Sequence, residues 1–255
     1  MTNWISCANR NPYAELRLIC FPYAGGSAHV FKGWETYLPA EVEVHAVQLP
    51  GRGQRIGETP IDNLADLTMN LSGALGPLTD RPFAFFGHSM GALISYELAR
   101  TLRRQGAPQP AHLFLSARHA PHLPSQRTPI HHLPDSKFVA ELERYRGTPA
   151  AVLQNRELMD LFLPALRADF TISERYDYVA EEPLPCPIAA FGGVQDELVS
   201  RTSLAAWEEH TRGDFSLRLF PGDHFFLQSA QPLLLRALAQ TLREETIVRV
   251  RQEQV

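Results

Sequence analysis

Residues 85–91 read Phe-Phe-Gly-His-Ser-Met-Gly, and the Gly-x-Ser-x-Gly pattern inside this stretch decides the predicted fold. An apolar run precedes the pattern and a helix-forming run follows it, so we expect a strand, a sharp turn and a helix. Gly87 and Gly91 stand where a side chain would collide with the strand or the helix. The hydroxyl of Ser89 would then project above the sheet edge as a nucleophile. The N–H of Met90, at the helix start, would face any negative charge that develops there.

The composition is that of one folded domain with a substantial core. The chain has 255 residues, which fits a single α/β domain spanning 1–255. Its hydrophobic content is 44% and its charged content is 20%, as is usual for a globular protein. The net charge of −4 gives no electrostatic reason to expect nucleic acid or an anionic membrane as a partner. The three cysteines lack metal-binding spacing, and we expect Cys20 and Cys186 to be core residues without a disulfide.

The sequence carries no signal for export or for membrane insertion. The first residues lack the basic and apolar regions of a secretion signal. No apolar run approaches the roughly 20 residues that a membrane-spanning helix needs. Because the cysteine usage also suits a reducing compartment, we expect a cytoplasmic protein. No interface pattern is visible, so a monomer is expected.

Apolar or alternating runs recur along the chain, with helical stretches between them. They predict strands at 16–21, 42–47, 83–86, 111–116, 187–193 and 215–220. A helix is expected over 64–75, with Asp62 or Asn63 as its N-terminal cap. This alternation predicts a mostly parallel central sheet flanked by helices, with ligand chemistry at the carboxyl ends of the strands.

The pattern changes between about 120 and 182, where several prolines are followed by helical segments. Apolar residues recur every four positions from Leu158 to Phe170, which predicts a helix with a broad apolar face. We interpret this segment as a helical lid, inserted between strands, above an apolar pocket. The alternative is that the apolar face simply packs on the domain core. After the last strand, an amphipathic helix is expected over about 227–247, and the tail beyond Arg249 is expected to fray.

A serine hydroxyl reacts well only when a base lies within hydrogen-bond reach and a carboxylate orients that base. Hydrolases with this serine turn supply the groups in the chain order serine, acid, histidine. Asp196, in the loop after a late strand, is the preferred acid, and its neighbour Glu197 is the alternative. His224 follows the last strand and is the candidate base. His88, locked into the turn beside Ser89, is expected to pack rather than to react.

Two backbone N–H groups are needed to stabilise an oxyanion beside the nucleophile. Met90 supplies the first, and we expect Ala24 to supply the second, from the small-residue loop after the first long strand. Losing such a donor typically costs about 3–4 kcal/mol of transition-state stabilisation.

Five stretches taken together resemble the type II thioesterases of polyketide and nonribosomal peptide assembly lines. They are Phe-Pro-Tyr-Ala-Gly-Gly-Ser at 21–27, Gln-Leu-Pro-Gly-Arg-Gly at 48–53, Gly-His-Ser-Met-Gly at 87–91, Leu-Arg-Ala-Asp-Phe at 166–170 and Gly-Asp-His-Phe-Phe at 222–226. The resemblance covers nearly the whole chain. One departure is Tyr23, where many family members carry histidine. Arg52 and Arg55 match the family's Pro-Gly-Arg loop, but no catalytic role is evident for them, and we interpret both as solubilising surface residues.

The resemblance implies an α/β-hydrolase fold and a stand-alone editing enzyme. Such an enzyme hydrolyses misprimed or stalled acyl or aminoacyl groups from the phosphopantetheine arm of carrier proteins. By position, Ser89, Asp196 and His224 would form the catalytic triad, and Ala24 and Met90 the oxyanion hole. The chain would need no metal or organic cofactor, because the phosphopantetheine belongs to the carrier protein.

Three other readings of the same residues stay open at this point. A small-molecule carboxylesterase or lipase would use the same triad on oxygen esters. An acyltransferase would pass the acyl group to a hydroxyl or an amine instead of water. A hydrolase-fold binding protein without activity is the third, although the serine, acid and histidine in the expected order argue against it.

Overall fold

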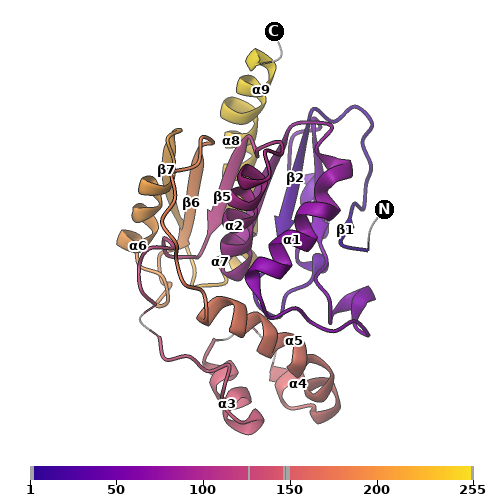
Figure 1. The fold of residues 1–255 in the computed structure, drawn as a ribbon, viewed down its shortest axis with the longest axis vertical. Coiled ribbons are helices and arrows are strands. Elements are labelled where there is room, and N and C mark those ends of the chain that lie inside the picture. Colours follow the sequence, from indigo (N-terminus) through magenta and orange to yellow (C-terminus); the bar gives the residue numbers. More distant parts are fainter. Residues whose placement is uncertain (1–2, 126, 146, 148–149, 254–255) are drawn as a thin grey trace.

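A seven-stranded sheet forms the centre of the molecule, and helices cover both of its faces (Figure 1). The computed structural model describes residues 3–125, 127–145, 147 and 150–253. The strand order is β1-β3-β2-β4-β5-β6-β7, and all neighbours run parallel except β1, which pairs antiparallel with β3. The bounds are Ile5–Ser6 for β1, Leu16–Phe21 for β2, Val42–Val47 for β3, Phe83–His88 for β4, His112–Ser116 for β5, Ile188–Gly193 for β6 and Phe215–Phe220 for β7. The predicted mostly parallel sheet is confirmed.

The central strands are apolar because both faces of the sheet are covered. Every residue of β2, β4 and β6 is buried. On β4, Phe83 and Phe85 pack into one core, while Ala84 and Phe86 pack into the core on the opposite face. The six predicted strands all form near their expected bounds, and the sequence misses only β1, a two-residue edge strand too short to carry a pattern.

Two helical layers enclose the sheet. On one face lie α1 (Leu64–Leu75) and α2 (Met90–Arg104), and on the other lies α8 (Gln231–Thr241) (Figure 1). The shorter elements are α6 (Arg201–Ala205) and the 3-10 helices Ala28–Phe31, Trp34–Thr36, Gly53–Arg55, Gly76–Leu78 and Ala206–His210.

The expected helix over 64–75 is α1, with the same bounds. Its N-terminal cap is Asn63, whose side-chain oxygen accepts hydrogen bonds from the N–H groups of Ala65 at 2.8 Å and Asp66 at 3.1 Å. Of the two candidates, Asn63 rather than Asp62 therefore satisfies the unpaired donors of the first turn.

Three helices between β5 and β6 lie across one end of the sheet: α3 (Asp135–Tyr145), α4 (Ala150–Leu153) and α5 (Arg156–Glu174) (Figure 1). They share an apolar cluster separate from the two sheet cores. In it, the ring of Phe170 meets Phe138 edge-on at 5.5 Å and Tyr145 at 5.0 Å. Of the predicted apolar face, Leu166 and Phe170 are buried in this cluster, whereas Leu158 is exposed. The helix α5 runs on through Pro164.

The prediction of one continuous helix over 227–247 is wrong. The chain instead forms α7 (Phe226–Ser229), α8, a π-helical turn (Leu242–Ile247) and α9 (Val248–Glu253). The break falls at Ala230, which leaves helical geometry just before Pro232, where a missing N–H is tolerated in the first turn of a new helix. The expected fraying beyond Arg249 is also wrong up to Glu253, because α9 continues and buries Val250.

The interpretation of Arg52 and Arg55 as surface residues is wrong, because both are buried. The guanidinium of Arg55 stacks 3.9 Å above the ring of Trp4 and donates to the Gln48 carbonyl at 3.0 Å. Arg52 pairs with a buried carboxylate, described below. The loop after β3 therefore folds inward around its arginines, and a local pattern of polar residues could not reveal this.

The structure also bears on the predictions about cysteines and about membrane-spanning helices. No disulfide joins the three cysteines, and Cys20 and Cys186 are buried as expected. Across the described ranges, we find no helix with the length and apolar character to cross a bilayer.

A buried polar cluster lies between α2 and the 3-10 helix that ends at His210. The Tyr96 hydroxyl hydrogen-bonds with His210 Nδ1 at 3.0 Å, and His210 Nε2 lies 2.6 Å from His122 Nδ1. Burial, followed by the positive charges of His122 and Arg100, lowers the pKa of His210 to about 4. The folded protein therefore holds this imidazole neutral.

We expect the thermal midpoint Tm to fall as the pH is lowered through the window set by His210. In the unfolded chain, a histidine is protonated below about pH 6.5, whereas His210 in the folded chain stays neutral down to about pH 4. Between these values the unfolded chain binds one more proton than the folded chain. The stability is therefore fully present above about pH 6.5 and is lost as the pH falls toward 4. Circular dichroism melts of the wild type and of His210→Gln should show a smaller acid-induced loss of Tm in the variant, and parallel curves would contradict this.

Candidate active site

Ser89 sits at the turn between β4 and α2 in a strained backbone conformation, with φ 54° and ψ −113°. This region costs a non-glycine residue of order 1–3 kcal/mol. The surrounding turn fixes it, because the Ser89 N–H donates to the Ser116 carbonyl at 2.8 Å. A Cβ on Gly87 would lie 2.2 Å from the Gly91 carbonyl oxygen, and one on Gly91 would lie 2.1 Å from that of Phe21. Both glycines are therefore required by close backbone approach, as the sequence predicts.

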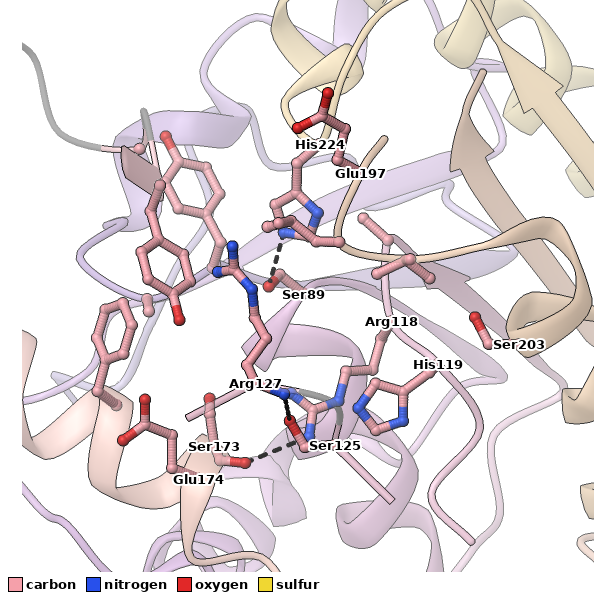
Figure 2. Close-up of a pocket in the computed structure, with 18 of the residues that line it drawn as sticks. Ser89, Arg118, His119, Ser125, Arg127, Ser173, Glu174, Glu197, Ser203 and His224 are labelled. Carbon is pink, nitrogen blue, oxygen red and sulfur yellow. Dashed lines mark hydrogen bonds between the residues drawn. The ribbon is translucent and has the colours of Figure 1, made fainter. Parts of the chain in front are cut away.

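The structure brings the three predicted catalytic side chains into one hydrogen-bonded row. His224 Nε2 lies 3.1 Å from Ser89 Oγ (Figure 2), and His224 Nδ1 lies 2.9 Å from Asp196 Oδ2. The Asp196 side chain is fully buried, and its other oxygen accepts from the N–H groups of Leu198 at 2.8 Å and Val199 at 3.2 Å. These bonds hold the carboxylate in place with Oδ2 aimed at the imidazole.

Glu197, the alternative acid, lines the pocket instead of reaching His224 (Figure 2). The loops that carry the acid and the base are bonded to each other. The Gln195 N–H donates to the Gly222 carbonyl at 2.9 Å, and the Gln195 side-chain oxygen accepts from the Gly222 N–H at 2.6 Å. This pairing fixes the register in which Asp196, and not its neighbour, faces His224.

The two predicted oxyanion donors lie beside the nucleophile on different segments. Met90 is the first residue of α2, and Ala24 lines the same pocket as Ser89. The neighbouring N–H groups are already engaged, Gly25 by a carboxylate at 2.7 Å and Gly26 by the Tyr23 carbonyl at 2.8 Å. Within the described part of the chain, the Ala24 and Met90 N–H groups have no protein acceptor. They are thus available for a substrate oxygen.

A serine, histidine and carboxylate row beside two open N–H donors is an arrangement for nucleophilic acyl transfer. The sequence model of the thioesterase domain family matches residues 16–243 of the chain. The chain belongs to this family. The thioesterase is 47% identical to the gramicidin S biosynthesis protein GrsT of Aneurinibacillus migulanus, over 95% of both chains.

Solved structures agree with this membership and with the α/β-hydrolase fold. The thioesterase RedJ of the prodiginine pathway in Streptomyces coelicolor superposes with a TM-score of 0.83 at 43% identity, covering 89% of this chain and 90% of that one. The type II thioesterase BorB of the borrelidin cluster gives 0.85 at 38% identity, covering 94% and 98%. The sequence-based resemblance to type II thioesterases is confirmed, and the chain is a thioester hydrolase on a serine hydrolase fold.

Two of the family motifs, Leu-Arg-Ala-Asp-Phe at 166–170 and the Pro-Gly-Arg loop, have no role that is evident from the sequence. In the structure, a side-chain contact connects them. The Arg52 guanidinium holds Asp169 of α5 through two bonds, Nη1 to Oδ2 at 2.5 Å and Nη2 to Oδ1 at 2.7 Å. Asp169 Oδ2 is also the acceptor of the Gly25 N–H. This buried ion pair, the Arg52–Asp169 pair below, fastens the loop of Ala24 to α5 of the thioesterase.

His88 packs, as expected, but it also supports the base. Its Nδ1 lies 2.8 Å from Ser116 Oγ, and its Nε2 lies 3.0 Å from the His224 carbonyl oxygen. Since a carbonyl only accepts, Nε2 carries the proton and Nδ1 accepts from the serine hydroxyl. Burial, then the nearby charge of His224, lowers the pKa of His88 well below its usual value. A neutral His88 thus holds the backbone of His224 in place, a role that the sequence interpretation missed.

Ser89 and His224 open into a cavity of about 350 Å³ between the sheet edge and the helices α3 and α5. Its lining includes the apolar side chains of Leu142, Leu166 and Phe170. It also includes charged and hydroxyl groups, among them Arg118, Arg127, Ser125, Ser173 and Glu174 (Figure 2). The thioesterase can therefore enclose a chain-like ligand that has both apolar and polar parts.

One group of potential metal ligands occurs among the described residues, but its contacts do not fit a cation. It consists of Cys7, Glu43 and His45, and none of them lines the cavity of Ser89. The Glu43 carboxylate already lies 2.6 Å from His45 and 3.5 Å from the Arg17 guanidinium. The positive charge of Arg17 opposes a metal ion there.

Proposed function

We propose that this thioesterase is a stand-alone editing enzyme that hydrolyses misprimed or stalled acyl groups from the phosphopantetheine arm of carrier proteins. The observation that carries the proposal is the hydrogen-bonded row Ser89, His224 and Asp196, in which Ser89 and His224 line a cavity, in a chain of the thioesterase family. The biosynthetic roles named for GrsT and BorB support the assembly-line setting.

The proposed reaction begins with proton transfer from Ser89 Oγ to His224 Nε2 as the oxygen attacks the thioester carbonyl carbon. The carbonyl oxygen becomes an oxyanion between the Ala24 and Met90 N–H groups. When the C–S bond breaks, the proton on His224 passes to the departing pantetheine sulfur. Asp196 stays ionised and stabilises the imidazolium throughout.

Water completes the cycle in the proposed mechanism. His224 takes a proton from water as its oxygen attacks the acyl group on Ser89, and returns that proton to Ser89 Oγ as the carboxylic acid leaves. This chemistry needs no metal or organic cofactor in the chain. The layer α3–α5 would act as a lid that admits the arm and covers the acyl group.

The test loads a carrier protein with acetyl, propionyl or aminoacyl groups on its phosphopantetheine and follows the loss of acyl mass by intact-mass spectrometry. We expect rapid deacylation by the wild type and much slower turnover of matched oxygen esters. Ser89→Ala controls for contaminating hydrolases. Fast hydrolysis of the oxygen esters without deacylation of the carrier protein would support a carboxylesterase. Transfer of the acyl group to an added alcohol or amine would support an acyltransferase. No turnover of either substrate would support a binding protein.

A further inference from the structure

Two non-glycine residues in the described part of the chain have a positive φ, and both border the reaction cavity. They are Ser89, with φ 54°, and Ala117, with φ 52°. Each follows the carboxyl end of one of two neighbouring strands, since His88 of β4 pairs with Ser116 of β5. Strain of this kind persists where the surrounding structure imposes it, and it concentrates at functional sites. At Ser89, the strain belongs to the nucleophile itself. At Ala117, whose side chain is a methyl group, the strained backbone sets the direction of the next residue, Arg118.

The backbone around Ala117 is locked, so that the next side chain, Arg118, has a fixed origin. The Ala117 N–H donates to the Phe191 carbonyl at 2.8 Å, and the Trp207 indole N–H donates to the Arg118 carbonyl at 2.7 Å. From there the Arg118 side chain projects into the cavity that contains Ser89 (Figure 2). A long cation held in this way is a preorganised binding group.

The charge of Arg118 has no counter-ion among the described residues. Its Nη2 donates to the Ser173 carbonyl at a long 3.4 Å, and its buried Nε has no hydrogen-bond partner. The carboxylate of Glu174, on the same cavity wall, is occupied by the N–H groups of Ile130 and His131 at 2.9–3.0 Å and by the His131 ring at 2.7 Å. Enclosing an unpaired charge in this way costs several kcal/mol.

Arg118 nevertheless stays cationic at neutral pH. Burial lowers its pKa to about 10, which is still well above 7. A second cation, Arg127, lines the same cavity, with its guanidinium 4.1 Å above the ring of Tyr145 (Figure 2). Ser125 and Ser203 also line the cavity. The wall therefore offers positive charge and hydrogen-bond donors to whatever enters.

We infer that Arg118, assisted by Arg127, binds an anionic oxygen group of the thioester substrate. A guanidinium holds a carboxylate or a phosphate through two parallel hydrogen bonds, which fits an arginine whose Nε has no partner and whose Nη2 makes only a long bond. The anion is either a carboxylate on the acyl group or the phosphate of the phosphopantetheine arm. This inference rests on the proposed function and specifies the substrate class for the same site.

The test uses malonyl and 3-methylbutanoyl thioesters, which have the same branched shape but differ in the charge at their end. Each is made on phosphopantetheine and on pantetheine without the phosphate. For the substrate whose anion binds Arg118, we expect Arg118→Met to lower kcat/KM about 10–100-fold. The loss should follow the malonyl group if the acyl carboxylate is bound, and the phosphate if the arm is bound. Substrates without that anion should change less than about threefold.

Arg144→Met is the matched control, because Arg144 is an exposed arginine on α3 paired with Glu141. It should leave all four substrates unchanged. An equal loss on all four substrates with Arg118→Met would make Arg118 a structural residue and overturn the inference. The absence of any loss would overturn it as well.

A binding measurement keeps the inference separate from the proposed function. If the wild type hydrolyses none of the four thioesters, the proposed function fails, and kcat/KM gives no information on Arg118. Calorimetric titration with malonate and with phosphopantetheine then decides. We expect one of them to bind the wild type at least about tenfold more tightly than Arg118→Met. Equal affinity of the two proteins for both compounds would overturn the inference without reference to turnover.

Discussion

Replacing Asp196 with asparagine is expected to lower kcat about 10⁴-fold, against about 10⁶-fold for Ser89→Ala. The carboxylate accepts the proton of His224 Nδ1, which leaves Nε2 free to take the proton of Ser89. An asparagine amide can donate to Nδ1 instead. The imidazole then carries its proton on Nε2 and cannot act as a base. Charge stabilisation of the imidazolium is lost at the same time.

The matched control is Glu197→Gln, which removes the same charge one residue away. Glu197 lines the cavity but makes no bond to His224, so kcat should stay within about threefold of the wild type. Carrier deacylation under saturating substrate gives kcat, and circular dichroism confirms that each variant is folded. A large loss in Glu197→Gln, with Asp196→Asn nearly as active as the wild type, would assign the acid to Glu197.

Much of the fold was predictable because the sheet is buried on both faces. Strands such as β2 and β4 need mostly apolar residues, and these are visible in the sequence without any knowledge of their partners. The positions of Ser89 and His224 follow from the same feature, since Ser89 stands directly after β4 and His224 lies in the loop that follows β7. Gly87 and Gly91 carry their own explanation, because no side chain fits where they lie.

What the sequence could not supply depends on contacts between distant segments. Arg52 and Asp169 are separated by 117 positions, so the sequence around either residue does not reveal that the other neutralises its charge. Local composition made Arg52 look exposed, because an arginine in a glycine-rich loop is usually solvated. Arg118 gave no signal for a similar reason, since its importance comes from partners that it lacks in the folded protein. Pairing across the fold, rather than propensity, decides these positions.

Replacing Asp169 with asparagine is expected to destabilise the protein by about 3–5 kcal/mol and to lower kcat about 10–100-fold. The stability falls because Arg52 keeps a buried charge without a counter-ion. The rate falls for a different reason. Asp169 Oδ2 holds the Gly25 N–H at 2.7 Å, and Gly25 follows the proposed oxyanion donor Ala24 directly. When that hold weakens, the Ala24 N–H leaves its position, whereas substrate binding elsewhere in the cavity, and hence KM, changes little.

A double variant separates the two effects of the Arg52–Asp169 pair. Replacing both partners together, as Arg52→Met with Asp169→Leu, removes the uncompensated charge, and a buried ion pair exchanged for apolar residues is often neutral for stability. We therefore expect Tm to recover above that of Asp169→Asn, as measured by thermal melts. The Gly25 N–H still lacks its acceptor, so kcat should remain at least about tenfold below the wild type. If kcat recovered together with Tm, the pair would act on stability alone. A persistent loss of kcat in a protein of restored stability would show that α5 positions the oxyanion loop.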